Sequence, residues 1–325
     1  MLSFAGTIFG IVLLIGGGTL LVRGASEIAE GYGVSPMVVG LTIVGFGTSS
    51  PELVVNIVGA LQGATDIAFG NVVGSNISNL GLVLGATAIM CPMTMHSAVV
   101  RRELPLLLLA TTMMAVMALD GLLEGGVSVI SRTDAIVLGL MFLIFVYATV
   151  LDFLNTREDD PLLVEISGSS VFGGSTKSRL RWLLVIAGFV LLMIGGELTV
   201  RSGIGLAAQL GVSATVIGLF VVAVGTSMPE LVTSIIAALR DEPDLALGNV
   251  IGSNIFNLLV VLPASGIISQ IPVPPGGVGD VVFSWVLAAL LIPVFFLGKA
   301  SLGRPAGVML LLAYAGYAGW RIVAG

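Results

Sequence analysis

Ten apolar stretches, each close to the length of a membrane-crossing helix, constrain this chain more than any other feature. A helix needs about 20 mostly apolar residues to cross the hydrocarbon core, whereas a membrane strand needs about 9–11 alternating ones. The stretches cover residues 4–22, 36–61, 66–90, 104–119, 133–151, 182–200, 213–239, 244–268, 281–298 and 305–322. Each is bounded by charges, prolines or glycines, so we expect ten helices that cross a lipid bilayer.

The composition supports this expectation and excludes a soluble globular protein. Hydrophobic residues make up 56% of the chain and charged residues only 10%, whereas soluble domains carry about 25% charged residues. The single cysteine, Cys91, excludes an internal disulfide and is interpreted as a packing residue. The net charge of −6 and the lack of a dense basic patch exclude a nucleic-acid partner. The first stretch lacks the basic start and cleavage site of a signal peptide, so we expect it to remain as a span.

The basic residues predict the orientation in the membrane. If the N-terminus lies outside, ten of the thirteen Lys and Arg residues face the cytoplasm, as the positive-inside rule requires. We therefore expect a multi-pass protein of the cell (inner) membrane with both termini outside. The segment 152–181 would lie inside, and we interpret it as a solvated linker. A regulatory cation sensor is the alternative, but so short a segment is too small for a folded domain.

An internal repeat relates the two halves of the chain. GTSSPE at 47–52 matches GTSMPE at 225–230, and GNVVGSNISN at 70–79 matches GNVIGSNIFN at 248–257. Glu230 follows Glu52 by 178 residues, and Asn257 follows Asn79 by the same offset. Each copy holds five spans, and because five is odd, the second copy must enter the membrane from the opposite side.

The predicted fold class is therefore an all-α integral membrane protein with ten transmembrane helices in two inverted five-helix repeats. The first repeat covers residues 1–151, the linker 152–181 and the second repeat 182–325. Inverted repeats are common in secondary transporters, whose substrate sites lie at the midplane between the copies.

Two carboxylates stand out because they lie near the middle of apolar spans. Glu52 and Glu230 hold matching positions in the repeat, and no Lys or Arg lies within their spans. A charge at that depth costs roughly 2.5–3.5 kcal/mol on insertion scales. A bound cation or a proton is expected to offset this cost at both positions.

Further oxygen atoms lie at helical spacing around both glutamates. Pro51 and Pro229 remove a helical N–H, which frees the carbonyls of Gly47 and Gly225. An ordinary helix kink is the alternative interpretation for a single copy. Thr48 and Ser49 share a helix face with Glu52, and Thr226 and Ser227 share one with Glu230. In the next span of each repeat, a serine and an asparagine four residues apart also share a face: Ser75 with Asn79, and Ser253 with Asn257.

Four more asparagines, Asn71, Asn76, Asn249 and Asn254, are interpreted as structural. Hard oxygen ligands without thiolate or imidazole favour Ca²⁺ or Na⁺, with Mg²⁺ less suited to a dehydrated site.

The paired motifs GTSSPE with GNVVGSNISN and GTSMPE with GNVIGSNIFN resemble the two alpha-repeats of the cation/calcium exchanger superfamily. The resemblance covers both repeats and is strongest to prokaryotic sodium/calcium exchanger-like proteins. It implies a secondary active antiporter that exchanges Ca²⁺ for Na⁺ by alternating access. It implies no cofactor and no enzymatic activity, and the chain would act as a monomer or a homodimer.

The resemblance also implies which residues bind the ions. The family's ligands fall on Thr48, Ser49, Glu52, Ser75 and Asn79 in the first repeat and on Thr226, Ser227, Glu230, Ser253 and Asn257 in the second, with backbone carbonyls near Gly45 and Ala223. Some members of the superfamily carry Asp where Asn257 stands, so this chain has two carboxylates rather than three. That difference weakens a case for potassium co-transport.

Three alternatives to sodium/calcium exchange remain. A proton/calcium antiporter is plausible because two nearby carboxylates repel and burial favours their protonated forms, although the many neutral oxygens favour Na⁺. A cation channel is disfavoured by the inverted repeat and the discrete site. An intramembrane enzyme is disfavoured because the chain lacks a catalytic triad or a metal-binding pair of histidines, and its only histidine, His96, is expected on the surface.

Overall fold

The protein is described from a computed structural model. The described residues are 2–63, 65–94, 99–121, 125–158, 176–209, 223–297 and 301–324. His96, the beginning of the predicted span 213–239 and the middle of the predicted linker 152–181 lie outside them.

In the first half of the chain, helices occupy the positions of the apolar stretches, and short breaks or wider turns divide several of them. The elements are α1 (Leu2–Tyr32), α2 (Pro36–Val39), η1 (Gly40–Val44), α3 (Gly45–Thr48), α4 (Ser50–Leu61), α5 (Asp66–Ser78), η2 (Asn79–Val83), α6 (Leu84–Met90), β1 (Met93–Thr94), η3 (Val99–Glu103), α7 (Leu104–Ala118), β2 (Val129–Ile130) and α9 (Arg132–Glu158). The η segments are π-helical turns within longer helices.

The second half repeats the helices and strands of this order where it is described, except that α17 begins without a π-helical turn like η3. Its elements are α11 (Thr176–Gln209), α13 (Ala223–Thr226), α14 (Met228–Leu239), α15 (Pro243–Phe256), η5 (Asn257–Val261), α16 (Leu262–Ile268), β3 (Ile271–Pro272), α17 (Gly277–Leu297), β4 (Ser301–Leu302) and α18 (Arg304–Ala324). The π-helical turns η2 and η5 begin at Asn79 and Asn257, which hold matching positions in the two motifs.

Several helices run past the apolar stretches that predict them. The first stretch ends at residue 22, but α1 continues to Tyr32; α9 continues to Glu158 and α11 begins at Thr176. Helices α9 and α11 therefore extend into the segment 152–181 from its two ends. Hydropathy marks only the part of a helix that lies in lipid, whereas helical hydrogen bonding continues into water.

Among the described residues, six helices are long and apolar enough to cross a membrane: Phe4–Tyr32, Ala68–Met90, Arg132–Leu151, Ser178–Gly205, Pro243–Ile268 and Gly277–Val294. The pair Pro36–Thr48 and Ser50–Leu61, bent by 42° at its break, is a seventh candidate. The protein is thus mostly helical, with several helices suited to crossing a bilayer.

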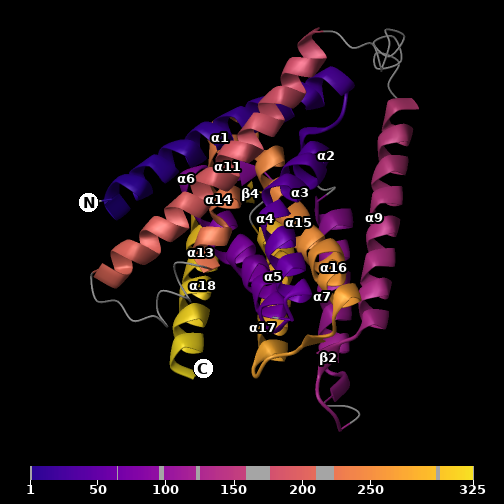
Figure 1. Ribbon diagram of the computed structural model, residues 1–325. Coiled ribbons are helices and arrows are strands. Elements are labelled where there is room, and N and C mark those ends of the chain that lie inside the picture. Colours follow the sequence, from indigo (N-terminus) through magenta and orange to yellow (C-terminus); the bar gives the residue numbers. More distant parts are fainter. Residues whose placement is uncertain are drawn as a thin grey trace.

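Two long helices, α1 and α11, slant side by side across one face of the molecule (Figure 1). Glycines allow this close approach. A Cβ atom on Gly17 would lie 2.8 Å from the carbonyl oxygen of Gly188, and a Cβ atom on Gly195 would lie 2.8 Å from that of Gly10. These two contacts are related by the repeat offset of 178 residues. The helices therefore pack backbone to backbone at two equivalent places.

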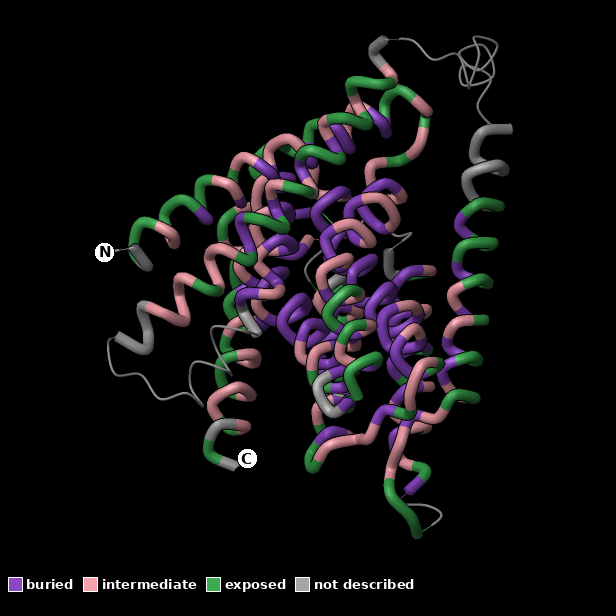
Figure 2. Tube along the Cα trace, viewed as in Figure 1, coloured by how far each residue is buried: buried purple, intermediate pink, exposed green. Residues whose placement is uncertain are grey.

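The most deeply buried spans are the ones that carry the GN-x₂-GSN motifs. In the span 243–268, 94% of the apolar window is buried, and in 68–90 the share is 78%. The spans of α1, α9, α11 and α17 are only 28–33% buried, and Figure 2 shows the outer helices marked by exposed residues. The polar motifs thus lie at the centre of the helix bundle.

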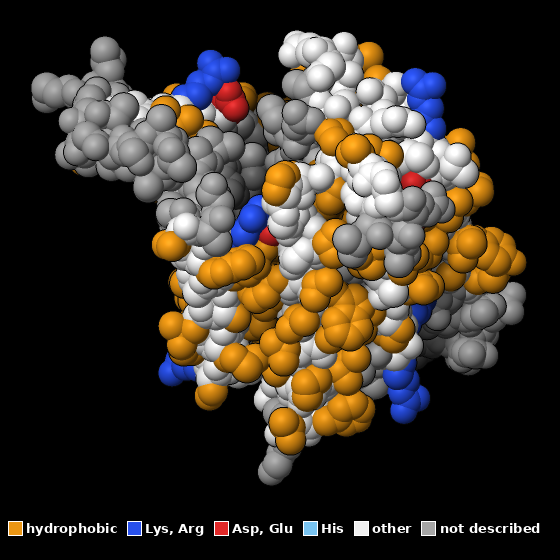
Figure 3. Space-filling model, turned by 90° about the horizontal axis from the view of Figure 1, so that it is seen from below, with side chains coloured by type: hydrophobic (Ala, Val, Ile, Leu, Met, Phe, Trp, Pro, Cys, Tyr) orange, Lys and Arg blue, Asp and Glu red, His pale blue; other side chains and the backbone are white. Residues whose placement is uncertain are grey.

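The outer surface is apolar over a large area. Phe4, Leu143 and Leu183 are 60% exposed or more. Figure 3 shows hydrophobic side chains spread over the face seen from below, with few charged groups among them. Such a surface suits a lipid environment rather than water.

Short strands join the two halves of the chain. Strand β1 pairs antiparallel with β4, with Met93 opposite Leu302, and β2 pairs antiparallel with β3, with Ile130 opposite Ile271. Each pair takes one strand from each half, so the loops of both halves are held together.

Candidate cation site

The two GTS-x-PE motifs break their helices in the same way. Helix α3 ends at Thr48 and α4 begins at Ser50, while Ser49 between them has φ −86° and ψ 6°. In the second half, Ser227 has φ −85° and ψ 6° between α13 and α14. Because proline fits the first turn of a helix but not its interior, each break places its glutamate in the first turn of the next helix.

Glu52 and Glu230 are both buried, with about 1% of their surface exposed. Ser49 Oγ donates to Glu230 Oε1 at 3.1 Å. Among the described residues, no hydrogen-bond partner reaches either oxygen of Glu52 or Oε2 of Glu230. A buried acceptor without a partner is costly, so these oxygens are candidates for binding a cation or a proton.

Three further oxygens at expected ligand positions are also buried without a hydrogen-bond partner among the described residues. Within the described part of the chain, Asn79 Oδ1, Asn257 Oδ1 and Ser227 Oγ make no hydrogen bond. Together with the three carboxylate oxygens, they give six buried oxygen atoms that could face a cation. They come from α4, η2, α14, η5 and the break before α14.

Thr48 and Ser253 form a second cluster, in which the expected ligands contact one another. Thr48 Oγ1 lies 3.3 Å from Ser253 Oγ, and both hydroxyls lie within hydrogen-bonding distance of the Gly45 carbonyl, at 3.3 and 3.2 Å. Helices α3 and α15 thus bring together residues that are some two hundred positions apart in sequence.

The remaining expected ligands lie on the same elements. Ser75 is buried on α5, one turn before Asn79. Thr226 is half-buried and ends α13, and Ala223 begins that helix, although its side chain lies outside what the structure describes.

Asn249 is a residue that the sequence interpretation placed outside the site. Its Oδ1 accepts from Thr48 Oγ1 at 3.1 Å, and its Nδ2 donates to Ser234 Oγ at 2.9 Å and to the Glu230 carbonyl at 3.3 Å. It therefore links an expected ligand of one repeat to the backbone of the other. Its position four residues before Ser253, on the same helix face, was the signal for this role.

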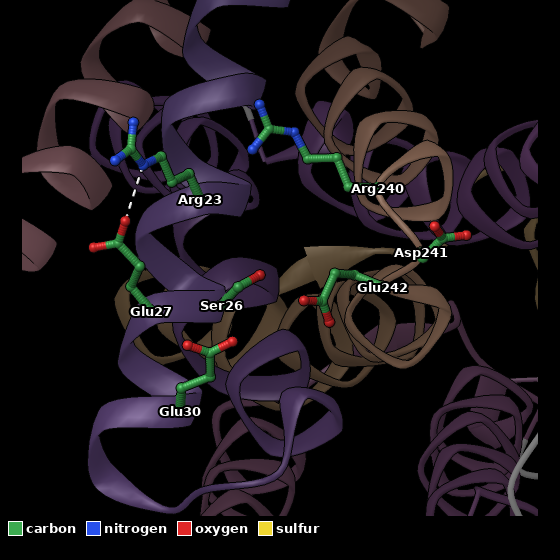
Figure 4. Close-up of a pocket in the computed structure, with 7 residues that line it drawn as sticks. All are labelled: Arg23, Ser26, Glu27, Glu30, Arg240, Asp241 and Glu242. Carbon is green, nitrogen blue, oxygen red and sulfur yellow. Dashed lines mark hydrogen bonds and ion pairs between the residues drawn. The ribbon is translucent and has the colours of Figure 1, made fainter.

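A separate polar pocket lies between the C-terminal end of α1 and the turn from α14 to α15. It has a volume of about 330 Å³ and is lined by Arg23, Ser26, Glu27, Glu30, Arg240, Asp241 and Glu242. In Figure 4, Arg23 points toward Glu27, with which it forms an ion pair of 2.9 Å. None of the expected ligands lines this pocket.

Acidic, histidine and cysteine side chains alone do not make a metal centre here. Across the residues that the structure describes, no group of three or more such side chains is arranged to hold a metal ion. A cation at the midplane would therefore need the neutral oxygens of Ser, Thr and Asn beside the two carboxylates. Such an oxygen-only set suits Ca²⁺ and Na⁺.

Comparisons with known proteins find similar sequences and structures over most of the chain. The family model described as sodium/calcium exchanger protein matches residues 2–151 and 180–323. The chain is 40% identical over 311 residues to CaxA of Alkalimonas amylolytica, whose name gives it a provisional assignment as an antiporter, and 95% of each chain is covered. It is 32% identical to the sodium/calcium exchanger MaX1 of Methanosarcina acetivorans, with 97% of each chain covered.

Solved structures with the same fold include the sodium-calcium exchanger NCX_Mj soaked with 100 mM Na⁺ and 10 mM Sr²⁺. The TM-score is 0.81 at 30% sequence identity, and the match covers 97% of this chain and 96% of that one. The inner membrane protein YrbG of Escherichia coli is 32% identical over 90% of this chain and 86% of its own. These relatives, together with the apolar helices, make this a multi-pass membrane protein.

Proposed function

The chain belongs to the sodium/calcium exchanger protein family, and from that premise we propose that it is a secondary active antiporter exchanging Ca²⁺ for Na⁺. Members of this family are transporters rather than enzymes. We propose that the ions bind between the two repeats, at the residues that the paired motifs supply, and that no cofactor takes part.

The observation that carries this proposal is a set of six buried oxygens of Glu52, Glu230, Ser227, Asn79 and Asn257 that have no hydrogen-bond partner among the described residues. Ca²⁺ takes six to eight oxygen ligands at flexible geometry. Two carboxylates balance the charge of one Ca²⁺, and the hydroxyl and amide oxygens complete its coordination. Burial of these groups away from water costs free energy that a bound cation would offset.

Sodium is the proposed coupling ion because most of the candidate ligands are neutral. A proton needs only a carboxylate, whereas Na⁺ needs several oxygens. Thr48, Ser49 and Ser253 supply buried hydroxyls, and that of Ser49 contacts Glu230. Proton coupling is the second candidate. It is favoured by the burial of both carboxylates, because burial disfavours the charged form of a carboxyl group.

We propose that the fold comprises ten spans in two inverted repeats, with both termini outside the inner membrane. The contacts between the halves support a two-fold relation: the paired strands, the paired glycine contacts and the matching helix breaks each recur at equivalent positions. In Figure 1, the C-terminal end of α9 and the N-terminal end of α11 lie at the top, the C-terminal end of α18 lies in the lower half, and the N-terminus lies at mid-height on the left.

Transport would proceed by competition and alternating access. Ca²⁺ and Na⁺ share ligands, so the two sets of ions cannot be bound fully at once. The proposed moving unit is the pair α1 and α11, which pack tightly on each other. Gly18 and Gly196 face the core: their Cβ atoms would lie 2.9 Å from a methyl group of Ile236 and 3.7 Å from Pro229. Small residues on that face leave a smooth surface for sliding.

The test is Ca²⁺ uptake into proteoliposomes loaded with Na⁺ and diluted into Na⁺-free buffer, with the pH clamped equal on both sides. Uptake should occur and should vanish when Na⁺ is equal across the membrane. Uptake that instead follows a pH gradient and ignores Na⁺ would establish proton coupling. Steady single-channel currents would contradict a carrier altogether.

The glutamates are tested in the same vesicles. Glu52→Gln and Glu230→Gln should each abolish Ca²⁺ uptake while leaving the protein folded, because each removes one of the two charges that balance Ca²⁺. Glu197→Gln is the matched control, since Glu197 is 60% exposed and pairs with Arg201 at the surface. Normal uptake by either buried variant would refute the site assignment.

A further inference from the structure

Cation binding by Asn79 and Asn257 depends on which way each side-chain amide points. Each offers an oxygen, which can bind a cation, and an NH₂ group, which cannot. A half-turn of the amide exchanges the two. A site that uses these side chains as oxygen ligands therefore needs a neighbour that holds the NH₂ group away from the ion.

That neighbour is well defined for Asn257. Its Nδ2 donates to Asn76 Oδ1 at 3.1 Å, across the boundary between the repeats. Its Oδ1 is buried and, among the described residues, unpartnered. The donor end of the amide is thus engaged, and the acceptor end is left for a ligand.

The orientation of Asn76 is itself fixed by a backbone group. Asn76 Nδ2 donates to the carbonyl oxygen of Asn254 at 3.3 Å. A carbonyl can only accept, so the Nδ2 end of Asn76 must face it and the Oδ1 end must face Asn257. Only the NH₂ group of Asn257 can then satisfy Asn76. The Asn254 carbonyl therefore fixes the orientation of Asn76. Asn76 in turn engages the NH₂ group of Asn257 and leaves its oxygen available.

We propose that Asn76 is a positioning residue, which turns the Asn257 oxygen toward the transported cation and raises cation affinity without touching the ion. This inference rests on the proposed function of the site. Both polar ends of the Asn76 side chain are engaged by protein groups, as expected for a residue that orients another side chain.

The counterpart in the other repeat is held less firmly. Asn79 Nδ2 donates to Asn254 Oδ1 at 3.3 Å, which is the same contact after the repeat offset. Asn254 Nδ2, however, has no hydrogen-bond partner in the described part of the structure. Asn254 thus lacks the backbone anchor that Asn76 has. Its replacement should cost less cation affinity than replacement of Asn76.

The experiment measures Ca²⁺ binding to the purified full-length protein by titration calorimetry. Asn76→Leu keeps most of the volume and removes the acceptor, and it should weaken Ca²⁺ binding about 10- to 100-fold, as loss of an outer partner of a metal ligand does. Thr87→Val is the control for losing a buried polar group on the same span. Among the described residues, the Thr87 hydroxyl bonds only to the Val83 carbonyl of its own helix, so its replacement should leave Ca²⁺ affinity unchanged.

A double-mutant cycle separates positioning from packing. A carboxylate has two equivalent oxygens and needs no orientation, so in an Asn257→Asp background the further change Asn76→Leu should have little effect on Ca²⁺ affinity. A packing defect would lower affinity equally in both backgrounds. Equal losses would therefore overturn the inference. If Asn76→Leu does not fold, Asn76→Ser, whose hydroxyl is too short to reach Asn257, takes its place in the same cycle.

The outcomes also distinguish this inference from the proposed function. If the unmodified protein binds Ca²⁺, Glu52→Gln abolishes binding and Asn76→Leu has no effect, positioning by Asn76 is refuted and the site stands. If the unmodified protein binds no Ca²⁺, or Glu52→Gln binds it normally, the proposed site fails and the positioning role fails with it.

Discussion

The packing of α1 against α11 predicts a sharp difference between two adjacent glycines. A Cβ atom on Gly17 would lie 2.8 Å from the Gly188 carbonyl oxygen and 2.8 Å from the Leu192 nitrogen, both backbone atoms. A Cβ atom on Gly16 would meet no atom of the described residues within 4 Å. Gly17→Ala should therefore force the two helices apart, whereas Gly16→Ala should fit.

The structure gives the size of the effect. Ordinary contact begins at 3.4 Å, so the helices would have to separate by about 0.6 Å at this crossing. Overpacking of this kind costs about 1–3 kcal/mol. Both substitutions gain the same helix propensity, about 0.5–1 kcal/mol over glycine, so the difference between the two variants isolates the steric cost.

Thermal unfolding of the purified protein in detergent measures this difference. Gly17→Ala should unfold at a lower temperature than the unmodified protein, and Gly16→Ala at the same or a slightly higher one. Gly195→Ala repeats the test at the equivalent contact with Gly10 and should behave like Gly17→Ala. Equal unfolding temperatures for Gly16→Ala and Gly17→Ala would refute the backbone contact between α1 and α11.

Three further predictions concern groups away from the site. Cys91 donates to the Ala238 carbonyl at 3.3 Å, so Cys91→Ala should cost about 0.5–1.5 kcal/mol of stability and leave Ca²⁺ uptake intact; inactivation would reveal a thiol role. Asp280 accepts from Tyr317 and pairs with Arg321 at 3.0 Å, so Asp280→Asn should cost about 1–3 kcal/mol in thermal unfolding, and an unchanged unfolding temperature would contradict this. Epitope tags at both ends should be labelled by antibody on intact spheroplasts, and labelling only after permeabilisation would reverse the proposed orientation.

Much of the fold could be predicted from the sequence, because lipid imposes a simple pattern. Apolar runs located the helices at 66–90 and 243–268 closely, and the prolines at 51 and 229 located the two breaks. What hydropathy could not give was where a helix ends once it leaves the lipid, as α1 and α9 illustrate. The π-helical turns at η2 and η5 were also missed, because they alter hydrogen bonding without altering the apolar pattern.

The candidate site could be predicted residue by residue but not contact by contact. Helical spacing placed Thr48 and Glu52 on one face, yet it could not indicate that Thr48 reaches Asn249 in the other half of the chain. Pairing between distant segments depends on how the helices cross, which local periodicity does not contain. For the same reason, the cross-repeat bond from Asn257 to Asn76 was visible only in three dimensions.

The short strand pairs have a consequence for how the protein is made. Met93 in β1 is synthesised about two hundred residues before its partner Leu302 in β4. Strand β1 therefore remains without its partner until β4 has been made. Contacts of such long sequence separation form late and slowly. The first half is therefore expected to be less stable during synthesis than the completed chain, because both of its strands find their partners in the second half.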